Sequence, residues 1–467
     1  MSHDHNFLKG IGVLAMAIAL GACPGPEVIP DDLPPKDLVT RATPELPAVP
    51  AERVAASGVE EFEVDGLKVI LKPTPGRPIV SIQLFIDGGV ANLDEKTAGI
   101  EALALAVATH SGTQKTPRDD FNRKLNAMGS SIGASTNRDF SILSMGSVLP
   151  CFADTWRLFA EVLTAPAFDE KQLELDRERT IEGIKAEIED PEQRMSKTAS
   201  ELFFAAHPYV LRTDGTVETV QSFTREQLTA YLKALMTRER LTLVVVGDLT
   251  RATIEGAVRA DLAGLPAGQY QRRDLPPLDP GVADLSIAEQ ELPTNYMIGY
   301  FTAPAATHPD YYPLLVAINV LSDRLFEEVR TKRNLTYAVS SGLGARPYNY
   351  GYLYATPVDP TKTVEVMYAE IDRIQTEALT AKELSDQIEV FLTEHYMRQE
   401  TNSAQVATLG AAELNGGGWE QSLVFIDRVK AVTPADVTRV SKDYIKNIHW
   451  GIVGNPAAVD KALLTSR

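Results

Sequence analysis

The chain has 467 residues, with 45 Lys and Arg against 63 Asp and Glu, a formal net charge of −18 and two cysteines. At about 150 residues per domain, this length predicts roughly two or three domains with ample core, which excludes a small fold held by disulfides or a metal. The acidic balance argues against a nucleic-acid binder, because phosphate binding needs a Lys/Arg surface and the sequence contains no basic run.

The first 23 residues resemble a bacterial lipoprotein signal peptide. Lys9 precedes an apolar stretch from Gly10 to Ala22, which is too short to span a bilayer and is followed by Cys23. The string L-G-A-C resembles a lipobox, in which the cysteine receives diacylglycerol; the alternative is an ordinary cleaved signal with a chance cysteine. We therefore expect a protein anchored through Cys23 at the cell envelope, on the outer membrane and facing the periplasm.

Residues 24–56 are rich in proline and predict a semi-rigid, extended tether between the lipid and the first domain. With Cys23 acylated, Cys151 has no partner in the chain, so no internal disulfide is expected. We expect Cys151 to be a small buried residue.

The remaining sequence contains an internal duplication. Thr224 and Thr433 each precede an acidic residue and open a helical pattern that leads into a buried strand, Leu241–Val246 in the first copy and Trp450–Val453 in the second. At the same offset of about 210 residues, the helical pattern after Phe168 matches the one after Leu379. The sequence therefore predicts two homologous domains, at residues 57–263 and 284–467, with a Gly/Pro-rich linker at 264–283.

Within the first copy, alternating apolar residues with Asp65-Gly66 at the centre predict a hairpin over residues 62–71, and Ile79–Ile86 reads as a strand. An apolar helix is expected from about Ala98 to His110, with Gly112 just beyond its end. Hairpins mixed with helices indicate an α+β fold in which each domain packs an antiparallel-rich sheet against helices.

The order of these motifs resembles the insulinase/pitrilysin-type (inverzincin) metallopeptidases, in particular the two-domain branch that includes mitochondrial processing peptidase. The resemblance is carried by G-G-V-A-N-L-D-E-K-T-A-G-I-E-A-L at residues 88–103, H-P-Y at 207–209, L-V-V-V-G-D at 243–248 and F-E-E-V-R-T-K-R-N-L-T-Y at 326–337. It covers the chain from about residue 58 to the end. It implies that the linker joins the two domains into a clamshell around a hollow that holds extended peptides.

Active members of that family carry H-x-x-E-H, in which two histidines bind zinc and the glutamate activates water, with a distant glutamate as third ligand. In this chain the three motif positions are Leu103, Ala106 and Val107, and the better register puts the distant ligand at Gly183 beside Glu182. None of these residues except Glu182 has a donor atom for a metal. The sequence therefore predicts no catalytic residue, no metal ligand and no bound cofactor, with zinc expected only in an active partner.

The other candidates have ordinary structural explanations. His110 is expected to interact with the last carbonyls of its helix, and Glu101 to favour the dipole of the same helix. His207 resembles a structural turn, while Glu394 and His395 are expected on a solvated helix face. An unrecognised metal set of Glu101, His110 and Glu182 remains the alternative.

The resemblance also implies one surviving functional pair. Active relatives use an Arg and a Tyr seven residues apart to contact the backbone carbonyls of the substrate, and Arg330 and Tyr337 have this spacing. The alternatives are a surface salt bridge for Arg330 and core packing for Tyr337.

Together these features favour a non-catalytic homologue that binds extended peptides and pairs with an active H-x-x-E-H subunit, or with a second copy of itself, at the membrane. Two other hypotheses stay open. The first is that the chain is an active zinc endopeptidase with a non-standard metal site. The second is that it is an envelope scaffold that binds unfolded polypeptides in the manner of a chaperone.

Overall fold

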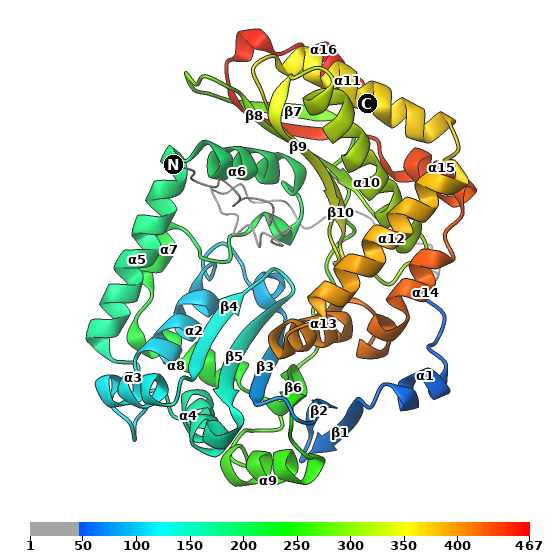
Figure 1. Ribbon diagram of the computed structural model, residues 1–467. Coiled ribbons are helices and arrows are strands. Elements are labelled where there is room, and N and C mark those ends of the chain that lie inside the picture. Colours follow the sequence, from blue (N-terminus) through cyan, green and yellow to red (C-terminus); the bar gives the residue numbers. More distant parts are fainter. Residues whose placement is uncertain (1–45) are drawn as a thin grey trace, which may run out of the picture.

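The computed structural model describes residues 46–467, and in it two sheets, each packed against helices, form a mixed α+β molecule (Figure 1). The signal peptide, Cys23 and most of the predicted tether lie outside the described residues. Between residues 46 and 467, no helix combines the length and the apolar character needed to cross a bilayer.

The first domain contains a six-stranded sheet in the order β1-β2-β6-β3-β5-β4. The predicted hairpin is confirmed, because Asp65 and Gly66 both have positive φ between its two strands. The strands are β1 (Glu60–Val64), β2 (Leu67–Pro73), β3 (Ile79–Asp87), β4 (Ser131–Thr136), β5 (Phe140–Val148) and β6 (Leu241–Gly247). The helices of this half are α2 (Ile100–His110), α3 (Arg118–Ala127), α4 (Phe152–Thr164), α5 (Glu170–Glu189), α6 (Pro191–Phe203), α7 (Val217–Ser222), α8 (Arg225–Leu235) and α9 (Arg251–Asp261).

The second domain repeats this plan with a five-stranded sheet in the order β7-β11-β8-β10-β9. Its strands are β7 (Asp284–Glu289), β8 (Tyr296–Thr302), β9 (Thr336–Leu343), β10 (Tyr350–Pro357) and β11 (His449–Gly454). Its helices are α10 (Tyr311–Leu325), the π-helix η5 (Phe326–Thr331), α11 (Pro360–Thr376), α12 (Ala381–Arg398), α13 (Asn402–Asn415), α14 (Phe425–Lys430), α15 (Pro434–Tyr444) and α16 (Lys461–Leu464). Short 3-10 turns complete the molecule at η1 (Gly89–Asn92), η2 (Leu149–Cys151), η3 (Pro208–Val210), η4 (Arg238–Arg240), η6 (Trp419–Val424) and η7 (Pro456–Ala458).

The internal repeat is visible in the helix caps and in the sheets. Thr224 and Thr433 each form a capping box at the start of α8 and α15, and Asp169 and Thr380 cap α5 and α12. The strand that follows the capped helix sits in the sheet interior in both halves, where β6 pairs in parallel with β2 and β11 with β7. Most other strand pairs are antiparallel, as the hairpins predict.

Each half lends one helix to the other, which the sequence did not predict. The face of the first sheet that carries Phe85 and Val244 is covered by α13, from the second half of the chain. The matching face of the second sheet is covered by α6, from the first half, so closely that a Cβ on Gly451 would lie 2.4 Å from the backbone N of Ala199. The two domains are therefore interlocked rather than simply joined by their linker (Figure 1).

Polar contacts add to this interlocking. Asp139 is 1% exposed and accepts hydrogen bonds from the Tyr209 hydroxyl and, at 2.8 Å, from the Arg346 guanidinium of the second domain. Burial, followed by the neighbouring Asp139 charge, raises the pKa of Tyr209 above its usual value. Arg138 donates to the Tyr350 hydroxyl at 3.1 Å across the same interface.

The chain enters the fold across the second domain. The Leu46 amide donates to the Thr307 carbonyl at 3.0 Å, and the Pro47 carbonyl accepts from Arg428 at 2.6 Å. A short helix, α1 (Ala51–Ala56), follows, and its Arg53 pairs with Asp427 of α14. The described end of the predicted tether is thus partly helical and docked, not extended throughout.

Candidate functional site

The degenerate zinc motif lies on α2, which packs between the first sheet and α5. Leu103 and Val107 are 2% and 0% exposed and belong to the hydrophobic core of the first domain, while Ala106 is partly exposed. Their hydrocarbon side chains have no lone pairs. The surface that would face a metal in an active enzyme is apolar and closely packed here.

The position predicted for the distant ligand, Gly183, lies in the middle of α5. It is exposed, and a Cβ added to it would meet no atom within 4 Å. The neighbouring Glu182 is also exposed, as expected for a solvated helix residue. The residues at the four degenerate motif positions, Leu103, Ala106, Val107 and Gly183, have no side-chain donor atoms and do not fit a zinc ion. We therefore derive no catalytic step through a metal.

Glu101 has a larger structural role than the sequence indicated. It is completely buried, and its carboxylate accepts hydrogen bonds from Ser141 at 2.5 Å and from the Tyr231 hydroxyl at 2.6 Å. The Arg240 guanidinium lies 3.8 Å away. Burial, followed by the Glu101 charge, raises the pKa of Tyr231. Glu101 thus ties α2 to β5 and α8, with both carboxylate oxygens occupied.

The unrecognised metal set is not assembled. Glu101 and His110 are nine residues apart on one helix, which separates them by about 13 Å along the axis and puts them on opposite sides. His110 does not meet the last carbonyls of its helix as expected; its Nδ1 lies 3.0 and 3.1 Å from the two carboxylate oxygens of Asp176 on α5. Across residues 46–467, no group of three or more His, Cys, Asp or Glu side chains is arranged to hold a metal ion.

The other histidines have structural partners. The His207 Nδ1 accepts the Tyr209 amide at 3.1 Å, which confirms the expected turn. His395 stacks on Phe425 of α14 rather than lying free on a solvated face, and burial lowers its pKa. Cys151 is partly exposed, so the prediction that it is buried was wrong.

Arg330 and Tyr337 do lie together, at the junction of the π-helix η5 and the edge strand β9. The Arg330 guanidinium carbon lies 4.5 Å from the centre of the Tyr337 ring and 4.7 Å from that of Phe326. Tyr337 is 79% exposed, which excludes core packing, and none of the described carboxylates forms an ion pair with Arg330. The cation lies against two aromatic rings, and no acceptor among residues 46–467 takes a hydrogen bond from its N–H groups.

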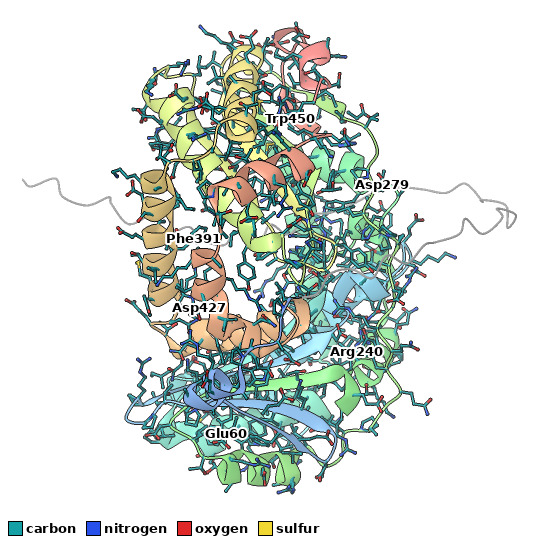
Figure 2. All side chains as sticks on the ribbon, turned by 90° about the vertical axis from the view of Figure 1, so that its right-hand side faces the viewer. Glu60, Arg240, Asp279, Phe391, Asp427 and Trp450 are labelled. Atoms are coloured by element: carbon teal, nitrogen blue, oxygen red, sulfur yellow. The ribbon has the colours of Figure 1, made fainter. Side chains whose placement is uncertain are left out.

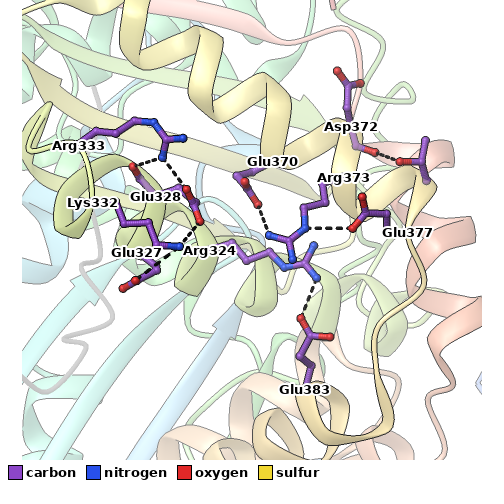
Figure 3. A network of polar contacts seen from close by, with 11 residues as sticks. Arg324, Glu327, Glu328, Lys332, Arg333, Glu370, Asp372, Arg373, Glu377 and Glu383 are labelled. Carbon is purple, nitrogen blue, oxygen red and sulfur yellow. Dashed lines mark hydrogen bonds and ion pairs between the residues drawn. The ribbon is translucent and has the colours of Figure 1, made fainter.

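Ion pairs brace the π-helix η5, which carries Arg330 (Figure 3 shows the ion pairs). Glu328 binds the Lys332 ammonium at 2.6 Å and the Arg333 guanidinium at 2.5 Å, which lowers the pKa of Glu328 to about 2. Arg324, one turn earlier on α10, pairs with Glu383 at the start of α12 at 3.0 Å. These contacts fix the backbone on both sides of Arg330.

Three contributors to these sites were missed at the level of sequence. Phe326 stands four residues before Arg330, a spacing that places both on one helix face, so this signal was available. Asp176 and Tyr231 carry no local signal, because they meet His110 and Glu101 only after long-range folding.

Comparison with known proteins supports one family. A model described as Insulinase (Peptidase family M16) matches residues 68–213, and one described as Peptidase M16 inactive domain matches residues 222–391. An uncharacterized zinc protease of Mycobacterium tuberculosis (strain ATCC 25618 / H37Rv) is 22% identical over 437 residues, which cover 89% of this chain and 97% of that protein.

Two solved structures show the same fold. The peptidase M16 inactive domain from Pseudomonas fluorescens has a TM-score of 0.78 at 20% identity, covering 85% of this chain and 98% of that chain. The periplasmic protease PqqL from Escherichia coli has a TM-score of 0.74 at 17% identity, covering 90% of this chain but 50% of that one. With both halves matched by models of one family, the chain belongs to the insulinase (M16) family of peptidases, as a member without the H-x-x-E-H zinc motif.

Proposed function

We propose that this protein is a non-catalytic family member that holds extended peptides and works beside a separate subunit carrying H-x-x-E-H and its zinc. The observation that carries the proposal is a contrast between two sites. The metal-binding positions are occupied by Leu103, Ala106, Val107 and Gly183, whereas Tyr337 is exposed and Arg330 is partly exposed and held against its ring. Loss of the first site with retention of the second favours binding over cleavage, and on this proposal the chain needs no cofactor of its own.

Peptide binding is supported by the free sheet edges as well as by Arg330. The edge strands β4 and β9 each pair with one neighbour, so alternate backbone N–H and C=O groups of each have no partner within the sheet. An extended peptide can add to such an edge through main-chain hydrogen bonds. The Arg330 guanidinium next to β9 supplies further donors for peptide carbonyls.

Pairing is supported by the size of the chain. It matches half the length of the Escherichia coli periplasmic protease, so that protein contains about one further body of this size. We propose that a second two-domain subunit, an active relative or a second copy, takes this place in the present protein. The proposed location is the outer membrane facing the periplasm, with acylated Cys23 as the anchor.

Peptide binding is tested by titrating a fluorescent unstructured peptide into the purified chain and recording anisotropy. We expect Arg330→Ala to weaken binding at least about tenfold, since a charge-assisted hydrogen bond contributes roughly 1.5–3 kcal/mol, and Arg330→Lys to weaken it less. Arg157→Ala, which removes an exposed arginine on α4 that has no contact with η5 or β9, is the matched control and should bind as the wild type does. Equal binding by wild type and Arg330→Ala would contradict the proposal.

Pairing and catalysis are tested on the same material. We expect stable binding of a co-expressed H-x-x-E-H relative, and peptide cleavage only by the pair. Stoichiometric zinc in the isolated chain together with cleavage would favour the active-peptidase hypothesis. Peptide binding that persists with no partner in cells would favour the scaffold hypothesis.

A further inference from the structure

A polar pocket of about 470 Å³ lies at the boundary between the two domains, and we call it the boundary pocket. None of its lining residues belongs to η5 or β9, so it is separate from the pair Arg330 and Tyr337. Figure 2 faces the side on which α13 lies above β1, the strand that carries the labelled Glu60. The charged and amide side chains that line the pocket are Glu61, Lys68, Glu413, Asn415 and Glu420.

The loop that connects α13 to η6 forms one wall of the boundary pocket. Gly418 has a φ of 115°, and a Cβ at this position would lie 2.7 Å from a carboxylate oxygen of Glu420. The next residue, Trp419, is 2% exposed and donates its amide to Glu413 at 3.1 Å and its indole N–H to Glu61 at 2.8 Å. These contacts hold the wall in place against the first domain.

Carboxylates outnumber cations in the boundary pocket. The Lys68 ammonium lies 2.5 Å from Glu413 and 3.3 Å from Glu61. Burial by itself would lower the pKa of Lys68, but the hydrogen bond and the charge of Glu413, together with Glu61, raise it above its usual value. Among residues 46–467, no cation pairs with Glu420. Three carboxylates and one ammonium leave a net charge of −2, which favours a cation over an anion.

Asn415 gives an independent indication that the boundary pocket takes a hydrogen-bond donor. Asn415 lines the pocket and is 7% exposed, and its Oδ1 accepts no hydrogen bond from any of residues 46–467. A buried acceptor without a donor destabilises a fold, so native proteins rarely keep one. The Glu420 carboxylate and the Asn415 amide oxygen can both be satisfied by one positively charged donor.

We propose that the boundary pocket binds a small organic cation through a primary ammonium group, which donates to the Glu420 carboxylate and to Asn415 Oδ1. An ammonium has three N–H donors and no acceptor, which matches a lining of acceptors. No three or more His, Cys, Asp or Glu side chains within residues 46–467 are arranged to hold a metal ion, so an organic cation fits the pocket better. The volume lies in the range of small-molecule sites, about 300–1,000 Å³.

Calorimetric titration of the purified protein tests the site with three probes. Cadaverine represents a free amine, Nα-acetyl-lysine amide represents a lysine side chain, and pentanol is the neutral control. We expect an amine to bind, more weakly at high salt, and pentanol not to bind. Binding of cadaverine alone would assign the site to free amines, and binding of the lysine amide alone would assign it to lysine side chains.

Two carboxylate variants locate the binding. Glu420→Gln removes the charge at nearly constant size, so we expect it to weaken amine binding at least about tenfold. Glu365→Gln, which changes an exposed carboxylate on α11, is the matched control and should bind as the wild type does. Binding of neither amine, equal binding of pentanol or of inorganic phosphate, or equal affinity of Glu420→Gln and the wild type would overturn the proposal.

A third variant separates a binding role of Asn415 from a structural one. Asn415→Leu removes the amide oxygen at nearly constant volume. We expect an unfolding midpoint at or above that of the wild type without amine, and a smaller rise in midpoint when the amine is added. A lower midpoint without amine, with the full rise on adding it, would overturn the assignment of Asn415. Arg330→Ala should bind amines as the wild type does, so failure of this proposal and failure of the peptide-binding proposal are distinguishable.

Discussion

At the scale of single residues, Glu101 and Glu182 show how position decides the role of a carboxylate. Both belong to the metal set that the sequence left open. Glu101 is completely buried and accepts two hydroxyl hydrogen bonds, whereas Glu182 lies in solvent on α5. The carboxylate with a structural role is therefore the one inside the domain, and neither is positioned with a second metal ligand.

A pair of amide substitutions separates the two roles. Glu101→Gln leaves the Ser141 and Tyr231 hydroxyls facing a side chain that accepts less well, so we expect it to lower the free energy of unfolding by about 2 kcal/mol. Glu182→Gln should change it by less than about 0.5 kcal/mol. Urea unfolding measures both. Equal effects, or a loss of bound zinc in either variant, would contradict this assignment.

Glycines provide a second contrast between residues. Gly183, the degenerate ligand position, has open space around it in mid-helix, so Gly183→Ala should raise the free energy of unfolding by up to about 1 kcal/mol. Gly451 faces the backbone of Ala199, which has no room to move, so Gly451→Ala should lower it by about 3 kcal/mol. Thermal unfolding measures both variants, and we expect a higher midpoint for Gly183→Ala and a lower one for Gly451→Ala. A destabilising Gly183→Ala would show that this position still contacts something.

At the scale of helices and strands, the sequence predicted most of what is local. The Asp65-Gly66 turn, the caps at Thr224 and Thr433 and the strands they lead to depend on a few neighbouring residues, and each is present. The exchange of α6 and α13 between the halves depends on which sheet face each helix finally covers. No short segment encodes that choice, because each helix packs on strands that lie far from it in the sequence. Tyr231 and Asp176, the partners of Glu101 and His110, were not predicted for the same reason, because they are distant in the sequence.

The start of α12 gives a pH-dependent prediction. Hydrogen bonds from the Thr380 backbone and side chain, with Arg324 nearby, lower the pKa of Glu383 to about 2, against 4.5 for a free glutamate. Its contribution to stability is therefore complete above pH 4.5 and is lost as the pH falls towards 2. We expect Glu383→Gln to lower the unfolding midpoint at pH 7 and to have little effect near pH 2. Thermal unfolding at both pH values measures the two effects, and an equal change in midpoint at pH 7 and pH 2 would contradict this role of Glu383.

At the scale of the whole molecule, the interlocked helices make two domains behave as one body. Since α6 completes the second domain and α13 completes the first, separating the halves exposes an apolar sheet face on each. Asp139 and Arg346 add a buried polar contact across the same boundary. Hinging at the linker would break these contacts, so we expect the two domains to stay together.

Cutting the linker tests this view. A protease site inserted next to Val282, which is 80% exposed in a segment without helix or strand, should allow complete cleavage. We expect the two fragments to elute together in gel filtration and to unfold in a single transition. The intact chain treated with the same protease is the control. Separation of the fragments under native conditions would show that the exchanged helices contribute little.

The exchange of helices also has a consequence for biosynthesis. The strands of the first sheet are synthesised well before the second half of the chain. The sheet face around Phe85 and Val244 therefore has no covering helix until Asn402–Asn415 has been translated. More than three hundred residues separate Phe85 from that helix. A nascent chain of this protein therefore presents an uncovered apolar sheet face from the completion of β6 at Gly247 to the completion of α13 at Asn415, which is about a third of its synthesis. We expect it to need chaperones during this interval more than two independently folding domains would.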